Sequence, residues 1–329
     1  MSRSRRCAGG LTGALTCETT SALGLVLGLS LTWLAVRVAL DGASTGIVSA
    51  GRVAFTVAAL WLLSRIPRRG DSAPPGDSPR RSPRASHPTV IRRRDAVVLS
   101  LTGVSGYTAL STLAVSNGGA VLPSLIVSTG PLWVLALTST LDRSRPRRLA
   151  LVGTVVSVAG TIGFLLLGGS GLMSVSWLAA ALATAAVVSM ACYSVHFARL
   201  TRTYHGPMAP VILPIYGWGL VPLSVWAALE LARGHRLTLQ AFIVLAALGL
   251  LVYLPVYLIQ HRLLASVGAH TVSLLGLTVT PLVALETGLL RLGPWPGGSQ
   301  WLMVGLTVLG MAMVIGPRRR QTDTQSRRA

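Results

Sequence analysis

Long runs of apolar residues alternate with short polar segments along most of the chain. Most runs are near the roughly 20 residues that a helix needs to cross the hydrocarbon core of a bilayer. Because they are continuously apolar, they predict transmembrane helices rather than the alternating strands of a membrane barrel. Ten runs can be drawn, at about residues 21–40, 45–65, 96–115, 119–141, 147–168, 174–199, 208–231, 239–264, 268–291 and 299–316.

The composition agrees with this pattern. Hydrophobic residues make up 51% of the 329 residues and charged residues only 12%, about half the share of a typical soluble domain. The predicted fold class is therefore all-α, a polytopic membrane protein with ten transmembrane helices. No small-residue cleavage site follows the first run, so we expect an uncleaved first helix rather than a signal peptide.

The positions of the arginines predict the orientation in the membrane. All 29 basic residues are arginine; with a cytoplasmic N-terminus, 24 fall in cytoplasmic segments and three in external loops. By the positive-inside rule, both termini are expected in the cytoplasm and the number of spans is even. The net charge of +20 suggests nucleic acid at first, but these arginines follow membrane topology, so no nucleic-acid partner is expected.

The chain is expected to comprise two halves between two tails. Residues 1–20 form a cytoplasmic tail, 21–169 a first five-helix repeat, 170–316 a second, and 317–329 another cytoplasmic tail. Within the first half, residues 66–95 hold six prolines and eight arginines and are expected to be a disordered linker. A basic arm that docks on anionic lipid or is regulated by phosphorylation is the alternative.

Five spans in each half give the second half the opposite orientation, which predicts an inverted-topology repeat. Two short matches occur in the same order in both halves. SLIVSTGPLWVLAL aligns with LLGLTVTPLVALET, and Gly103-x-x-x-Tyr107 parallels Gly249-x-x-x-Tyr253.

These segments carry a resemblance to a known family. Trp33 in the first span, Ser49-Ala50-Gly51-Arg52 at the second, Pro131 in the fourth and Pro281 in the ninth are similar to the EamA family. That family consists of ten-helix carriers within the drug/metabolite transporter superfamily, and the resemblance covers about residues 21–316. It implies a cytoplasmic-membrane carrier that moves small organic solutes, often outward. It also implies that the third, fourth, eighth and ninth helices surround the path, with the fifth and tenth peripheral.

The chain departs from the family at the ends of the fourth and ninth helices. A Gly-Glu pair is common there in the family, whereas this chain has Asp142 in the fourth and Leu292, beside Arg291, in the ninth. These departures leave the substrate open.

Two ionisable residues inside spans are the first candidates for the solute path, because charge inside a bilayer is costly. Arg52 and Glu286 are expected at similar depth, about 10 Å from the outer surface at 1.5 Å per residue. We hypothesise that they face each other as an ion pair, or form a carboxylate-binding site in which Glu286 is a proton switch. A purely structural pair, or Arg52 extending to the headgroups, is the alternative.

Further candidates are aromatic, polar and kinked positions. Tyr107 and Tyr253 occupy equivalent places in the two halves, and prolines can bend helices at the repeat interface. The predicted solute pathway comprises Trp33, Arg52, Tyr107, Asn117, Pro131, Tyr193, Tyr253, Pro281 and Glu286. The candidate proton relay comprises His196, His261 and His270; tolerated interfacial polarity is the alternative for each.

Catalysis is not expected. The sequence has no phosphate-cradling Gly-Lys motif, no evident pair of intramembrane carboxylates, and no metal-ligand spacing among Cys7, Cys17 and Cys192. No cofactor or metal is expected. The predicted function is a secondary transporter, exporter or facilitator of small organic metabolites or drugs by alternating access. An intramembrane enzyme or a non-transporting scaffold is the alternative. The expected partners are a small-molecule solute and membrane lipids, with a homodimer left open.

Overall fold

The structure, a computed structural model, is all-helical, with no strand among the residues that it describes. Six helices are long and apolar enough to cross a membrane, and four shorter apolar helices accompany them. The protein is therefore membrane-embedded and helical. The described residues are 22–31, 35–36, 38–65, 91–118, 126–143, 145–167, 176–204, 206–289 and 295–326.

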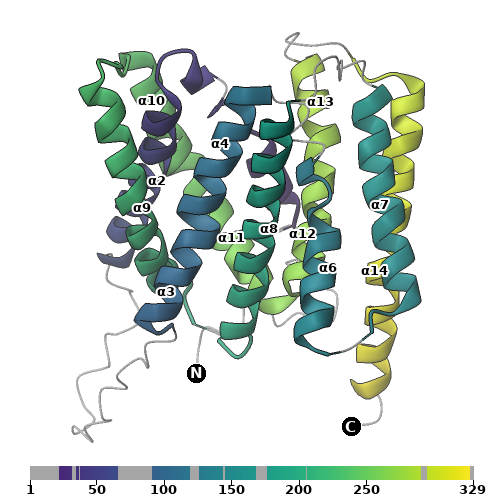
Figure 1. The fold of residues 1–329 in the computed structure, drawn as a ribbon. Coiled ribbons are helices and arrows are strands. Elements are labelled where there is room, and N and C mark those ends of the chain that lie inside the picture. Colours follow the sequence, from purple (N-terminus) through teal and green to yellow (C-terminus); the bar gives the residue numbers. More distant parts are fainter. Residues whose placement is uncertain are drawn as a thin grey trace, which may run out of the picture.

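The helices run side by side, with α7 and α14 together at one edge of the bundle (Figure 1). Two of the six long helices contain a π-helical segment, η2 in the third span and η3 in the eighth. In chain order the elements are the helix Ala22–Leu31, α2 (Thr45–Arg65), α3 (Arg93–Leu99), η2 (Ser100–Gly106), α4 (Tyr107–Gly118), α6 (Gly130–Leu141), α7 (Arg148–Leu167), α8 (Trp177–Leu200), α9 (Ala209–Ala232), α10 (Leu239–Ala247), η3 (Leu248–Tyr253), α11 (Leu254–Ser266), α12 (Ala269–Leu275), η4 (Gly276–Thr278), α13 (Val279–Leu289) and α14 (Gly298–Ser326).

The outer surface of the bundle is apolar. Trp177 is 83% exposed, Leu251 75% and Leu302 71%, values that would be costly in water for side chains of this size. Lipid chains in contact with these positions remove that cost. The bounds of the six long helices agree with the corresponding predicted runs to within about three residues.

Among the boundaries that differ from the prediction are the start of the third span and the end of α14. The third span begins at Arg93 rather than residue 96, so that Arg93 and Arg94 lie in its first helical turn. Helix α14 continues to Ser326, past the predicted end at 316, because no proline or glycine after Pro317 interrupts it. The predicted tail 1–20, most of the segment 66–95, and Trp33 lie outside the described residues.

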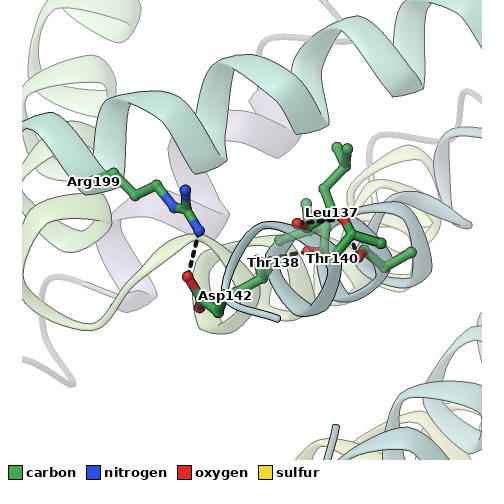
Figure 2. A network of polar contacts seen from close by, with 7 residues as sticks. Leu137, Thr138, Thr140, Asp142 and Arg199 are labelled. Atoms are coloured by element: carbon green, nitrogen blue, oxygen red, sulfur yellow. Dashed lines mark hydrogen bonds and ion pairs between the residues drawn. The ribbon is translucent and has the colours of Figure 1, made fainter. Parts of the chain in front are cut away.

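One end of the bundle is basic, and two charged contacts bring its parts together. Arg199, at the end of α8, forms an ion pair with Asp142, which follows the last turn of α6 (Figure 2). His196 Nε2 lies 3.6 Å from Asp95 Oδ1 in the first turn of α3. We call this the basic end; its other described arginines include Arg93, Arg94, Arg143, Arg145, Arg147, Arg148 and Arg202.

At the opposite end, Glu230 of α9 caps the N-terminus of α2. Its carboxylate accepts hydrogen bonds from the Ser44 hydroxyl and from the backbone N–H groups of Gly46 (2.9 Å) and Ile47 (3.2 Å). The first N–H groups of a helix have no partner within the helix, and their dipoles favour a negative charge. Glu230 is only 8% exposed, so this contact holds α2 and α9 together inside the protein.

Helices α7 and α14 pack closely through small residues. A Cβ atom on Gly310 would lie 2.5 Å from the backbone oxygen of Gly153 and 2.5 Å from the backbone nitrogen of Ser157. The Ser157 hydroxyl donates to the Thr307 carbonyl oxygen at 3.1 Å. Such small-residue contacts allow helices to associate where lipid offers no hydrophobic drive.

We expect Gly310→Ala to destabilise the protein. The added methyl group would meet backbone atoms that cannot rotate away, at a cost of about 1–3 kcal/mol. Gly305→Ala on the same helix is the matched control, because a Cβ there has no neighbour within 4 Å. Denaturant unfolding in detergent micelles measures both; equal stabilities of the two variants would contradict the packing described here.

Candidate functional site

Arg52 of α2 points into the bundle toward Tyr253, the last residue of η3. A guanidinium nitrogen, Nη1, donates to the Tyr253 hydroxyl at 3.3 Å, and Cζ lies 6.0 Å from the centre of the Tyr253 ring. Tyr107 and Tyr257 lie in the neighbourhood of the same guanidinium. A permanent positive charge is thus surrounded by tyrosines from three segments of the chain.

A stripe of rings continues from Tyr253 along α11. Tyr253, Tyr257 and His261 are four residues apart, so they share one face of the helix. The Tyr253 and Tyr257 rings stack with their centres 4.9 Å apart and an interplanar angle of 14°. Tyr216 of α9 lies against Tyr257, with ring centres 5.1 Å apart. We call these residues, with Arg52, Tyr193 and Phe197, the aromatic cluster.

His261 ends the stripe in a fully bonded environment. Its Nδ1 lies 2.6 Å from the backbone oxygen of Tyr257, which can only accept, so Nδ1 carries the hydrogen. Nε2 is then the acceptor, and the Tyr193 hydroxyl of α8 donates to it. The Phe197 ring packs edge-on at 4.7 Å, and His261 is 1% exposed. In the neutral imidazole, the network therefore fixes one tautomer, with the hydrogen on Nδ1.

Both π-helical segments lie beside the aromatic cluster, and each contains a glycine at a close contact: Gly103 with a ring and Gly249 with α2. A Cβ on Gly103 would lie 2.1 Å from the Tyr193 ring, and one on Gly249 would lie 2.3 Å from Phe55 Cβ. Ser189 of α8 ties its helix to η2: its hydroxyl donates at 2.8 Å to the Thr102 carbonyl oxygen, which also accepts from the backbone N–H of Tyr107. π-helical turns are rare and occur often at functional sites.

The two predicted bend prolines occupy similar positions. Pro131 lies in the first turn of α6, directly after a turn at 128–129. Pro281 lies in the first turn of α13, directly after the 3₁₀ segment η4. In both spans the proline therefore follows backbone that departs from α-helical hydrogen bonding.

The remaining predicted residues lie apart from the cluster. Asn117 is exposed and donates to the Leu113 carbonyl oxygen of its own helix at 2.8 Å. His270 Nε2 contacts the Thr154 hydroxyl of α7 at 3.0 Å, and His196 faces Asp95. The structure thus places the three predicted relay histidines in three different environments.

Arg52 and Glu286 have separate partners. The Ser30 hydroxyl oxygen contacts Glu286 Oε1 at 2.6 Å, while Arg52 bonds to Tyr253. Among the described residues, the contacts within 4.0 Å between basic and acidic side chains are the Arg199–Asp142 ion pair and the His196–Asp95 contact, which is an ion pair only when the imidazole is protonated. The hypothesised Arg52–Glu286 ion pair is therefore not formed in this conformation.

Sequence reasoning did not single out Tyr216, Phe197 or Glu230. Phe197 lies one helical turn after Tyr193, and that spacing could have identified it. Tyr216 and Glu230 meet partners on other helices, and nothing local in the sequence indicates those contacts. Glu230 is also a second carboxylate within a span, besides Glu286: it is buried near the end of α9.

A groove of about 400 Å³ opens between the third span and α9. Its lining is almost wholly apolar: Leu101, Ser105, Gly106, Ala109, Leu113, Pro222, Leu223 and Trp226. The Ser105 hydroxyl donates to the Ser100 carbonyl oxygen, so its one hydrogen is already used. Within the described ranges, no three His, Cys, Asp or Glu side chains gather where they could hold a metal ion.

Comparison with known proteins supports the fold alone. No protein-family model and no curated protein matches the sequence. Among solved structures 29 chains match; one, described only as "Crystal structure of protein", has a TM-score of 0.68 at 17% sequence identity. The match covers 93% of this chain and 99% of that chain. The fold therefore recurs in a solved structure of similar length.

Tyr193→Phe should destabilise the protein, because it leaves His261 Nε2 buried without a donor. The expected cost is about 1–3 kcal/mol in the free energy of unfolding. In a His261→Phe background the same change should cost much less, with a coupling of about 0.5–3 kcal/mol. Denaturant unfolding of the four chains measures this; additive costs would show that the two side chains do not interact.

Proposed function

We propose that the protein is a secondary transporter that moves small organic metabolites or drugs across the cytoplasmic membrane, as an exporter or facilitator. In this proposal it is an EamA-like carrier of ten helices in two inverted five-helix repeats that work by alternating access. The observation that carries the proposal is Arg52, a permanent cation surrounded by tyrosines inside a membrane-embedded bundle.

Arg52 has the properties of a binding group for an anionic part of a solute. Within the described part of the chain, no carboxylate lies within 4.0 Å of its guanidinium. A half-buried guanidinium with a neutral partner retains donors that can bind a carboxylate in bidentate geometry. The adjacent Tyr253 and Tyr257 rings offer flat apolar faces for the body of the solute. Solutes that carry a carboxylate are therefore the favoured class.

Matched irregularities in the two halves support the repeat. Gly103 lies within η2 and Tyr107 directly follows it, while Gly249 lies within η3 and Tyr253 is its last residue. Pro131 and Pro281 likewise each follow non-α-helical backbone. Two kinds of departure from regular helix, at corresponding places, are what a duplicated chain with paired hinges would have.

The orientation follows from the basic end. Arginines on the loops between α6 and α7 and after α8, and on the first turn of α3, gather there. At the opposite end the described arginines are Arg233 and Arg236. The positive-inside rule then assigns the basic end to the cytoplasm, which gives both termini a cytoplasmic location.

The test is solute transport by the purified protein in lipid vesicles. The panel comprises amino acids and other carboxylates, nucleobases and cationic drugs, each with and without a pH gradient. We expect movement of a carboxylate-bearing solute, and a loss of roughly tenfold or more in Arg52→Gln, since a hydrogen bond to a charged group contributes about 1.5–3 kcal/mol.

Arg233→Gln is the control, because Arg233 is exposed and directly follows α9, at the end of the bundle opposite the basic end. It should transport as the unmodified protein does. Undiminished transport by Arg52→Gln at normal membrane levels would overturn the role of Arg52. No movement of any compound in the panel would contradict the transporter proposal itself.

A further inference from the structure

The apolar groove between the third span and α9 opens sideways from the bundle. Val221 and Val225, which border its α9 wall, are exposed, and so is Leu101 on the other wall. Both walls belong to helices long and apolar enough to cross a membrane. The open side of the groove therefore faces the lipid that surrounds a membrane-embedded protein.

The walls are rows of residues four apart along each helix, and such residues share one helical face. The rows are Leu101, Ser105, Ala109 and Leu113 on the third span, and Pro222 and Trp226 on α9. From residue 101 to residue 113 the chain rises by about 18 Å at 1.5 Å per residue. This length is close to the hydrocarbon depth of one leaflet, about half of a roughly 30 Å core.

A positive charge lies at the end of the groove nearer the basic end. The Arg93 guanidinium is held over the Trp218 ring, with Cζ 5.1 Å from the ring centre. Trp218 precedes Pro222 by one helical turn, about 6 Å, so one face of α9 carries the ring and then the groove wall. No carboxylate among the described residues lies within 4.0 Å of this guanidinium. The ring thus positions a cation beside the groove, with donors left for an anion.

The cross-section of the groove favours a thin occupant. Its volume of about 400 Å³, divided by the 18 Å length, gives a mean cross-section of roughly 22 Å². A helix 10 Å across would need roughly 80 Å², so a helix of a second copy does not fit within the groove. A single extended hydrocarbon chain is much thinner than a helix and is the chemistry that the apolar lining accepts.

We propose that the groove and Arg93 bind one anionic phospholipid from the leaflet at the basic end. Its phosphate accepts hydrogen bonds from the Arg93 guanidinium, and one acyl chain lies between the third span and α9. Guanidinium and phosphate form charge-assisted hydrogen bonds in matched geometry. Anionic headgroups are concentrated at the membrane surface, where arginines attract them. Binding of this lipid does not require that the protein be a transporter.

Native mass spectrometry of the delipidated full-length protein in detergent tests the headgroup contact. The probes are phosphatidylglycerol and phosphatidylcholine with identical acyl chains. We expect phosphatidylglycerol to bind about fivefold more tightly, as one arginine near a headgroup contributes about 1 kcal/mol. Arg93→Gln should remove this preference.

Arg94→Gln is the matched control. Arg94 carries the same charge in the same exposed turn of α3, but about 100° around the helix axis from Arg93, so this variant should keep the preference. Equal binding of the two lipids by the unmodified protein, or equal losses in Arg93→Gln and Arg94→Gln, would overturn the site.

Photo-crosslinking in lipid vesicles locates the acyl chain without any substitution. The probe is phosphatidylglycerol with a diazirine in the middle of one chain. We expect label concentrated in segments 101–113 and 222–226, and lost from them in Ala109→Phe, whose larger side chain fills the groove. Leu302 of α14, which is exposed at another face, reports general contact with lipid. Labelling of the groove no stronger than labelling at Leu302 would overturn the proposal.

The same spectra report whether a second copy covers the groove instead. A dimer that carries no bound lipid and separates in Ala109→Phe would assign this face to contact between copies, and would overturn the lipid site.

Discussion

The absence of water inside a bilayer is the constraint on which this structure depends. Every backbone N–H and carbonyl group within a span needs a partner from the protein itself, because lipid offers none. Regular helix meets this need locally, and each departure from it requires a neighbouring side chain. Glu230 supplies the missing acceptors at the start of α2, and Ser189 adds a hydrogen bond from α8 to the Thr102 carbonyl oxygen of η2. The irregular places are thus held by contacts between helices.

The same constraint explains why chemically reactive groups are concentrated in few places. A guanidinium, an imidazole and a carboxyl group all lie within the bundle, and each has a hydrogen-bonding partner on another helix. Arg52 donates to a tyrosine hydroxyl, His261 contacts the Tyr193 hydroxyl, and Glu286 accepts from the Ser30 hydroxyl. These pairings also draw on five helices, namely the helix Ala22–Leu31, α2, α8, the eighth span and α13, so a movement between helices changes the partners of all three groups.

Much of the fold could be predicted from the sequence, because apolar length is a local property. The predicted run 45–65 coincides with α2, and 208–231 differs from α9 by one residue at each end. The predicted Tyr193, Tyr253, His261 and Arg52 do lie in one cluster. The partners of those residues could not be predicted, since Tyr216 and Glu230 reach their contacts only after distant helices pack. The parallel between the segments at Gly103 and Gly249 was visible in the sequence, but its π-helical form was not.

The Glu230 cap also constrains how the chain is assembled. Glu230 follows Thr45 by 185 residues, and ribosomes add about 5–20 residues per second. The start of α2 therefore waits roughly 10–40 s after its own synthesis before its acceptor exists. During that interval its N–H groups depend on headgroups and interfacial water. Helix α2 can take its final position only after α9 has entered the membrane, so the first half of the protein cannot mature before the second has begun.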